Sequence, residues 1–156
     1  MSRREHYQDP AAPKANSIVV AATAFVLDGE HRVLLVRRSD NGLWALPGGA
    51  MDVGERVAQT AERETLEETG YVVEVTDLIG VYSDPAHVMA YDNGEVRQQF
   101  ALSFRARLAG GSLRTSAESP EVAWVSERAA DALDVHPSIR LRLAHGFEVG
   151  AEPHLG

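Results

Sequence analysis

The stretch from Gly49 to Tyr71 constrains the fold of this chain more than any other part of the sequence. It is 23 residues long and carries six acidic and two basic residues. On a helix, at about 100° per residue, Glu64, Glu67 and Glu68 fall within one arc of roughly 100°. The apolar Ala61 lies on the same arc. We therefore expect these carboxylates on the helix face that meets the rest of the protein.

Two interpretations of these glutamates are open. A helix rich in Glu and Arg is often a solvated face with ion pairs between residues four apart, and Arg63 and Glu67 have that spacing. Carboxylates on a buried face are costly without partners, and Mg²⁺ or Mn²⁺ would bind them through oxygen. The glycine-rich loop 46–49 favours metal binding, because glycine lets a backbone approach a ligand closely. Gly70 stands where a glycine commonly ends a helix.

The fixed positions of this segment have a defined spacing. It reads Gly49, five residues, Glu55, seven residues, Arg63-Glu64, two residues, Glu67-Glu68, one residue, Gly70. This spacing resembles the signature of the Nudix hydrolases, which cleave nucleoside diphosphates linked to another group, and seven matched positions make the resemblance specific. The preceding segment 44–49 is also similar to the family, whereas Thr65 and Tyr71 depart from its usual residues. The similarity covers residues 17 to about 146.

The resemblance implies a fold, a cofactor and a set of roles. The fold would be α/β, a Nudix-type α/β/α sandwich with a mixed β-sheet. The ligands of Mg²⁺ or Mn²⁺ would be Gly48 through its carbonyl group, Glu64, Glu67 and Glu68. Arg63 would hold the glutamates in place and Glu55 would brace the loop. A water activated at the metal would attack phosphorus and release a nucleoside monophosphate and a phosphorylated remainder.

One carboxylate outside the signature is a further candidate. In several Nudix enzymes a loop ahead of a tryptophan-bearing strand delivers one more glutamate to the metals or to the attacking water. Glu118 stands six residues before Trp124 and fits that position better than Glu121. The alternative is an acidic, solvated loop. If the resemblance holds here, Glu118 is a mobile general base or an extra metal ligand, and otherwise Glu64 or Glu55 is the base.

Substrate contacts are expected on both sides of the signature. Arg37 and Arg38 close a predicted strand, and because consecutive strand residues face opposite ways, only one can point into the cleft. By similarity to the family we favour Arg38 as a phosphate or base contact over a solvated edge arginine. Family members specific for ADP-ribose often carry a proline about fifteen residues past the signature, near Pro85 here. Tyr82 is then a candidate to stack on the substrate.

Three functions are consistent with the resemblance. The first is hydrolysis of a nucleoside diphosphate linked to another group, such as ADP-ribose. The second is a house-cleaning pyrophosphohydrolase acting on oxidised or non-standard nucleoside triphosphates, and the fold alone cannot choose between these two. The third, from another class, is a non-catalytic Nudix-fold metabolite sensor. Such sensors tend to have a broken signature and an attached DNA-binding domain, and neither feature is expected here.

Composition excludes several classes of protein. With 156 residues, 44% of them hydrophobic, the chain can bury a core as one domain. It has no cysteine, which excludes disulfides and thiolate catalysis. A net charge of −8 argues against nucleic acid as a partner, and six histidines show no paired ligand spacing. No signal peptide or membrane-spanning run is apparent, so we expect a cytoplasmic protein with a nucleotide-derived substrate and no membrane partner.

The expected organisation is one Nudix domain over residues 17–147, with an N-terminal arm at 1–16 and a C-terminal tail at 148–156. Strands are predicted at 18–27, 33–36, 72–81, 96–108 and 122–125, and helices at 55–69, 127–133 and 138–147. The proline-punctuated arm is predicted to be flexible or to add a strand to a partner, with Tyr7 as its anchor. We therefore predict a homodimer in which the arm of each copy crosses to the other.

Overall fold

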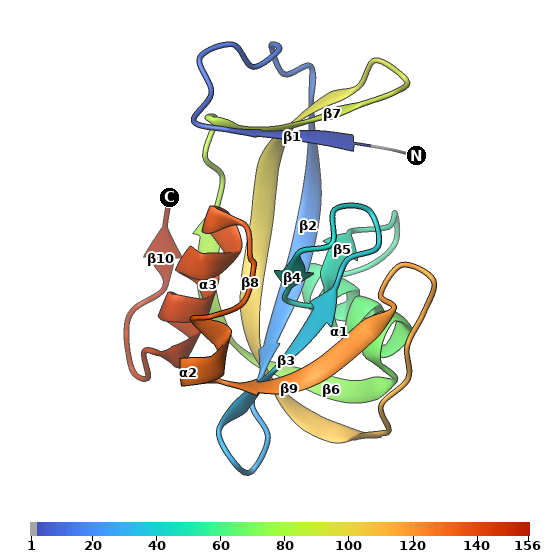
Figure 1. The fold of residues 1–156 in the computed structure, drawn as a ribbon, viewed down its shortest axis with the longest axis vertical. Coiled ribbons are helices and arrows are strands. Elements are labelled where there is room, and N and C mark those ends of the chain that lie inside the picture. Colours follow the sequence, from blue (N-terminus) through green and yellow to red (C-terminus); the bar gives the residue numbers. More distant parts are fainter. Residues whose placement is uncertain (1–2) are drawn as a thin grey trace.

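The computed structural model describes residues 3–156, whose helices and strands are shown in Figure 1. In chain order the elements are β1 (Arg3–Tyr7), β2 (Ser17–Val26), β3 (Arg32–Arg37), β4 (Trp44–Ala45), β5 (Gly48–Ala50), α1 (Val57–Thr69), β6 (Tyr71–Tyr82), β7 (His87–Tyr91), β8 (Val96–Gly111), β9 (Glu121–Ser126), α2 (Glu127–Ala130), α3 (Pro137–Phe147) and β10 (His154–Leu155). No helix among the described residues is long and apolar enough to cross a membrane. The predicted strands and helices are all found, with small changes at their ends.

The strands form two sheets, and the larger one is mixed. Its main path runs β1-β7-β8-β2-β5, with β6 also paired to β8 and β10 paired to β6. The pairs β2–β8 and β6–β10 are parallel, while the other pairs of this sheet are antiparallel. The smaller sheet has the order β4-β3-β9 and is antiparallel. The α/β fold with a mixed sheet is thus confirmed.

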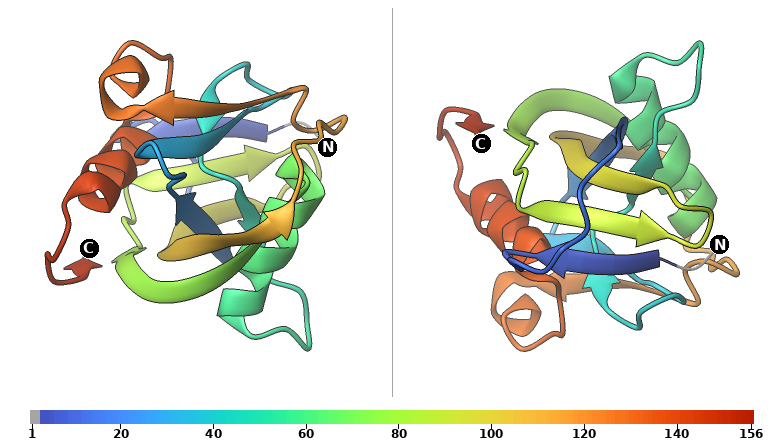
Figure 2. Two further views of the ribbon diagram at one scale, coloured as in Figure 1. Left: turned by 90° about the horizontal axis from the view of Figure 1, so that it is seen from below. Right: turned by 90° about the horizontal axis from the view of Figure 1, so that it is seen from above.

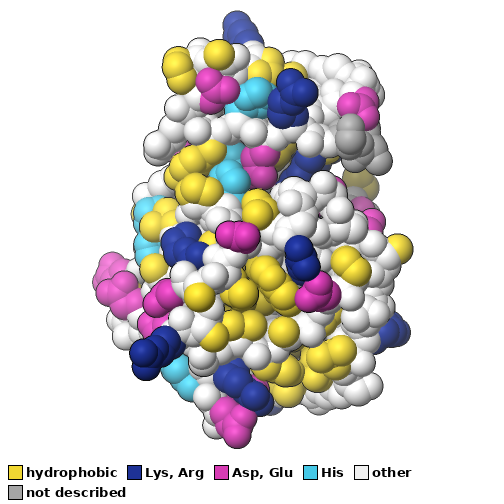
Figure 3. All heavy atoms as spheres, viewed as in Figure 1, with side chains coloured by type: hydrophobic (Ala, Val, Ile, Leu, Met, Phe, Trp, Pro, Cys, Tyr) yellow, Lys and Arg dark blue, Asp and Glu magenta, His cyan; other side chains and the backbone are white. Residues whose placement is uncertain are grey.

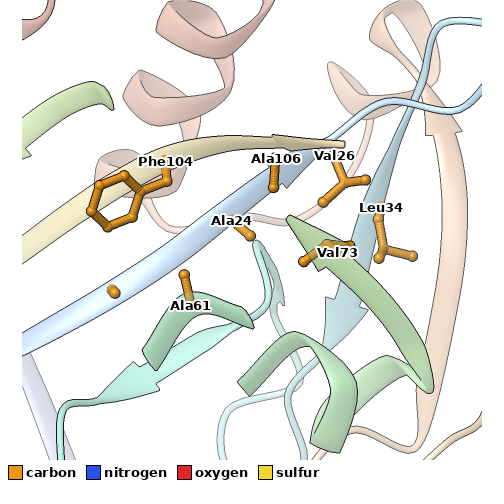
Figure 4. Packing of buried hydrophobic residues seen from close by; sticks show 8 residues of the cluster. Ala24, Val26, Leu34, Ala61, Val73, Phe104 and Ala106 are labelled. Carbon is orange, nitrogen blue, oxygen red and sulfur yellow. The ribbon is translucent and has the colours of Figure 1, made fainter. Parts of the chain in front are cut away.

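Strand β2 lies in the interior of the protein, and both of its faces are covered. Figures 1 and 2 show α1 and α3 on opposite sides of the strands. Ala24 and Val26 face the cluster that includes Ala61 of α1, as Figure 4 shows. Phe25, between them, packs into a second cluster with Leu143 of α3. A strand covered on both faces needs apolar residues at nearly every position, which explains its almost continuous apolar sequence.

The N-terminal arm corrects one expectation. Its strand β1 pairs with β7 of the same chain, with Arg3 opposite Tyr91 and Tyr7 opposite His87, rather than crossing to a partner. Strand β7 lies between the predicted strands 72–81 and 96–108, where no strand was predicted. It forms a hairpin with β8 through a turn at Gly94, which has a φ of 87°. The arm is ordered because β7 offers it a free edge, and sequence periodicity does not reveal such long-range pairing.

The C-terminal tail is also tied to the domain. His154 and Leu155 of β10, within the predicted C-terminal tail, pair with Gly80 and Val81 of β6. In addition, the backbone N–H of Ser83 donates to the carbonyl group of Gly156 over 2.6 Å. The tail therefore covers the edge of β6 beside α3.

Candidate active site

Helix α1 has the boundaries that its caps dictate. It begins after Arg56, whose backbone N–H donates to the side chain of Gln59 over 2.8 Å. It ends at Gly70, which has the left-handed φ of 81° expected for a helix-ending glycine. The unusual Thr65 is fully buried and donates its hydroxyl to the carbonyl group of Ala61 over 2.7 Å. A polar residue is tolerated at this position because its hydroxyl group has a partner inside the helix.

Arg63 is the centre of a network that ties the loop to the helix. Its Nε donates to Glu55 Oε2 over 2.6 Å and its Nη1 donates to Glu64 Oε1 over 2.8 Å. Weaker bonds reach Glu67 Oε2 at 3.2 Å and the carbonyl oxygen of Ala50 at 3.1 Å. Arg63 thus contacts three carboxylates of the signature, as the resemblance implies.

Glu55 stabilises the loop before α1. Its carboxylate accepts the backbone N–H of Asp52 over 2.9 Å and the hydroxyl of Thr60 over 3.0 Å, besides two bonds from Arg63. The hydrogen bond from Arg63, followed by the others, lowers the pKa of Glu55 to about 2. An ionised carboxylate that is already bonded on both oxygens is well placed to brace the loop and poorly placed to take up a proton.

The remaining glutamates of α1 differ in burial. The side chains of Glu64 and Glu68 are buried or nearly so, with Glu68 8% exposed, whereas the side chain of Glu67 is 57% exposed. The expectation that all three face the protein interior is therefore wrong for Glu67. Its Cα lies on the same arc, but the inner surface that α1 contacts ends before it, so its carboxylate reaches water.

Burial gives Glu68 and Glu64 unusual proton affinities. Burial, together with the charge of Glu64, raises the pKa of Glu68 to about 8, although the Gly48 backbone N–H and Arg38 oppose the shift. Burial also raises the pKa of Glu64, against the hydrogen bond from Arg63. Two adjacent buried carboxylates are difficult to ionise at the same time. A divalent cation bound between them would offset their charge.

Two glycines make room for these carboxylates. The backbone N–H of Gly48 donates to Glu68 Oε2 over 3.2 Å, and a Cβ at this residue would lie 2.3 Å from the carbonyl oxygen of Ala22. A Cβ at Gly49 would lie 2.5 Å from the carboxylate carbon of Glu64. The absence of a Cβ therefore lets Gly48 lie against β2 and lets Gly49 lie against Glu64 of α1.

A cavity of about 320 Å³ opens beside the glutamates. Its lining includes six residues that were candidates from the sequence: Arg38, Gly48, Gly49, Glu64, Glu68 and Glu118. Glu118 lies in the loop before β9, where its backbone carbonyl accepts the N–H of Ser39 over 3.0 Å. The structure therefore brings Glu118 together with two glutamates of the signature, while Glu55 and Glu67 lie outside the lining.

Arg38 occupies the position expected of a substrate contact. It lines the cavity and makes two hydrogen bonds to Asp40, at 2.9 and 2.7 Å. Burial tends to lower its pKa, but the bond to Asp40 and the charges of Asp40, Glu68 and Glu5 raise it. Arg37 points the other way and pairs with Glu121 over 2.8 Å. The alternation of strand side chains explains this division.

Tyr82 does not line the cavity that holds the glutamates, and its predicted stacking on the substrate stays a prediction. It is 6% exposed, and its hydroxyl is 2.7 Å from Nδ1 of His145. Its ring stacks on that of His154, with 5.1 Å between centroids. The end of β6 turns this side chain toward α3, where β10 covers it. It contributes, with Pro85, to a smaller pocket that adjoins this cavity.

The cavity also contains charged residues that sequence reasoning missed. The far wall carries Arg3, Glu5, His87, Arg97, His136 and Arg142. Ligand atoms of Glu5, His87 and His136 lie within 4.8 Å of one another, close enough to hold a metal ion. The six charged or titratable residues of this wall come from β1, β7, β8, the start of α3 and α3 itself. No local motif links them, because only the fold brings them together.

Comparison with known proteins identifies the family. A model of the NUDIX domain matches residues 18–145 of this chain. The chain belongs to the Nudix family and is a Nudix hydrolase.

Among similar proteins, a MutT-like protein of Streptomyces ambofaciens is 38% identical over 95% of this chain and 87% of its own length. A putative 8-oxo-dGTP diphosphatase of Bacillus subtilis is 36% identical over 67% of this chain and 64% of its own length. An ADP-ribose pyrophosphatase of Methanocaldococcus jannaschii is 32% identical over 62% of this chain and 55% of its own length.

The fold has solved counterparts. The crystal structure of a Nudix hydrolase from Nitrosomonas europaea superposes with a TM-score of 0.68 and 26% identity. The match covers 90% of this chain and 80% of that one. The two-sheet core between α1 and α3 is therefore the architecture of the family.

Proposed function

We propose that this protein hydrolyses the diphosphate bond of a nucleoside diphosphate linked to another group, such as ADP-ribose, with a divalent metal ion. The observation that carries the proposal is the cavity in which Glu64, Glu68 and Glu118 converge beside the Gly48–Gly49 loop. Arg63 holds the buried carboxylate of Glu64 and ties it to Glu55 of the preceding loop. Such a site can bind and orient an anionic substrate through metal ions.

The donor set fits Mg²⁺ or Mn²⁺. Two buried carboxylates and the loop carbonyl of Gly48 are hard oxygen ligands, and burial raises the pKa of both Glu64 and Glu68, an effect that a bound cation would offset. Nudix hydrolases typically use divalent metals. When bound, such an ion neutralises diphosphate charge and lowers the pKa of a bound water. Glu67 is exposed and bonded to Arg63, and is proposed as a ligand that becomes fixed on metal binding.

The other residues of the site have distinct proposed roles. Arg63 holds Glu64 in place and Glu55 braces the loop. Glu118, on its loop, takes a proton from the attacking water or adds a metal ligand. Arg38 lines the cavity and donates to a substrate phosphate. The hydroxyl of Tyr82 is occupied by His145, so we assign Tyr82 no contact with the diphosphate.

Substitution of Glu67 by glutamine tests the metal site. It should reduce diphosphate cleavage at saturating Mg²⁺, because a carboxylate ligand is lost from a cluster of three. Glu62→Gln, on the same helix but bonded to the backbone of Val75, tests whether any acid on α1 has this effect. Undiminished turnover by Glu67→Gln would remove that residue from the site.

A second candidate function is a house-cleaning pyrophosphohydrolase that acts on oxidised nucleoside triphosphates. The similarity to a putative 8-oxo-dGTP diphosphatase favours it, as the similarity to an ADP-ribose pyrophosphatase favours the first candidate. A panel of ADP-ribose, NADH, nucleotide sugars, CDP-alcohols and oxidised dGTP, read by phosphate release, separates them. Tight binding of one of these without turnover in Mg²⁺ or Mn²⁺ would instead support a metabolite sensor.

We also propose a homodimer and a cytoplasmic location, where nucleotide derivatives are made and used. Strand β1 is the last strand of the large sheet, so its outer edge can add a strand from a second copy. Sedimentation should give a dimer mass for the full chain and a smaller mass without residues 1–14. The same monomeric mass for both would reject the dimer.

A further inference from the structure

The wall of the cavity remote from α1 is lined by charged residues that the metal-site proposal does not use. Figure 3 shows histidine side chains beside acidic and basic ones where the strand pair β1–β7 meets the body of the molecule. Glu5 comes from β1, which precedes the segment 18–145 that matches the family. Arg142 comes from α3. Both line the cavity together with the glutamates of the metal site.

Arg142 is a buried cation that forms no close ion pair among the described residues, although the charge of Glu5 acts on it from a longer distance. Its residue is 3% exposed, its Nε has no hydrogen-bond partner, and no carboxylate among residues 3–156 lies within 4.0 Å of its guanidinium group. Within residues 3–156 its close support is the ring of Tyr82, whose centroid lies 4.9 Å from the guanidinium carbon. Burial lowers the pKa of Arg142 to about 10, so it is still charged at neutral pH. A buried charge without partners is costly, which implies that a bound ligand supplies the missing acceptor.

Glu5 is the complementary acceptor on the same wall. Its Oε1 accepts a hydrogen bond from Nε2 of His87 over 2.6 Å and lies 3.8 Å from Nε2 of His136. Burial would raise its pKa, but the hydrogen bond from His87 and the nearby positive groups lower it to about 2. Glu5 is therefore ionised at neutral pH and accepts hydrogen bonds without donating any.

The same three residues are poorly arranged as metal ligands. Nδ1 of His136 accepts the backbone N–H of Ser138 over 3.1 Å, and because an N–H can only donate, the ring proton of neutral His136 lies on Nε2. That nitrogen faces Glu5 and so acts as a donor. The rings of His87 and His136 are also stacked, 13° from parallel, so their in-plane lone pairs do not converge on one point. Hydrogen bonding is the better explanation of the cluster.

The position of Arg142 shows which part of a ligand it would meet. His87, Gln99, Ser138 and Arg142 line both the main cavity and the neighbouring pocket of about 240 Å³. None of the glutamates of the metal site lines that pocket. Arg142 therefore lies on the side of the cavity away from the diphosphate, where the nucleoside end of the substrate would extend.

We propose that Glu5 and Arg142 together bind the nucleobase of the substrate, Arg142 donating to a ring acceptor and Glu5 accepting from a ring or exocyclic N–H. This inference rests on the proposed function and adds to it that the N-terminal strand β1 determines specificity. A nucleobase carries a donor and an acceptor side by side on one edge, which matches an acceptor-only carboxylate and a donor-only guanidinium. A sugar phosphate without a base would leave both groups unbonded.

Calorimetric binding without metal tests the proposal, with GMP, AMP and ribose 5-phosphate as probes. The wild type should bind at least one nucleotide more tightly than ribose 5-phosphate. Glu5→Gln and Arg142→Met should each weaken the binding of that nucleotide by about tenfold or more. Each should leave the affinity for ribose 5-phosphate unchanged, because each removes one hydrogen-bond partner of the base only. Glu74→Gln, in an exposed pair with Arg107, is the matched control and should change nothing.

Three results would overturn the proposal. The first is equal binding of all three probes by the wild type. The second is an equal loss of affinity for all three probes in the variants, which would indicate a structural role. Melting temperatures of the variants, with Arg142→Lys as a charge-conserving comparison, identify that case. The third is a tight Zn²⁺ site in the wild type that Glu5→Gln abolishes. The proposed function fails separately, if no compound of the hydrolysis panel is cleaved, while base-dependent binding can still be measured.

Discussion

Replacing Arg63 by methionine should destabilise the protein through the network around it. The guanidinium donates to Glu55 and Glu64 at 2.6 to 3.0 Å and to Glu67 at 3.2 Å, while its own side chain is 28% exposed. Breaking a fully buried ion pair costs about 3–5 kcal/mol, and an exposed pair is worth about 1 kcal/mol or less. Partial exposure places Arg63 between these limits, so we expect a loss of about 2 kcal/mol.

Thermal and urea unfolding in EDTA measure this loss. For a chain of this size, about 2 kcal/mol corresponds to a fall of roughly 4–8 °C in melting temperature. Arg107→Met is the control, because Arg107 pairs only with Glu74 and both side chains are exposed by more than half. That substitution should cost less than about 1 kcal/mol.

The refuting result is a clear one. If Arg63→Met and Arg107→Met lower the melting temperature equally, Arg63 does not hold the glutamates in a cooperative network. Arg63→Lys adds a second check, because lysine retains the charge but cannot donate to several carboxylates in the geometry of a guanidinium. It should therefore recover only part of the lost stability.

Three further predictions concern the cavity. In EDTA, burial and Glu64 raise the pKa of Glu68 to about 8 from an ordinary 4.5, so stability present below pH 4.5 is lost as the pH rises through about 8. Glu68→Gln should remove this loss, and parallel melting curves against pH for both proteins would contradict the assignment. Glu118→Gln should lower kcat by about 10²–10⁴-fold with little change in substrate affinity, whereas a near-normal kcat would reject its role as a base. Gly49→Ala should fold yet lower kcat by roughly 10²-fold, because the new Cβ would displace the carboxylate of Glu64. Gly29→Ala, which meets nothing within 4 Å, should leave kcat unchanged.

The sequence by itself determined the features that depend on local spacing. The signature placed Glu64 and Glu68 on one face of α1, and Gly70 ended that helix. Apolar runs predicted the main strands, because a strand covered on both faces must be apolar throughout. The alternation of strand side chains allowed only one of Arg37 and Arg38 to face the cavity, and similarity to the family favoured Arg38, which lines it. Each of these conclusions needs only neighbours a few residues apart, which is the range that periodicity reports.

Only the tertiary structure decided what depends on distant partners. Tyr82 is directed away from the glutamates because α3 and β10 close over it. Glu67 reaches water because the surface that buries Glu68 does not extend over it. Glu5 and Arg142 meet one cavity although 136 residues separate them, since β1 pairs with β7 and α3 packs on β6. Contacts of this kind arise from pairing and packing between elements, and no local pattern of residues encodes them.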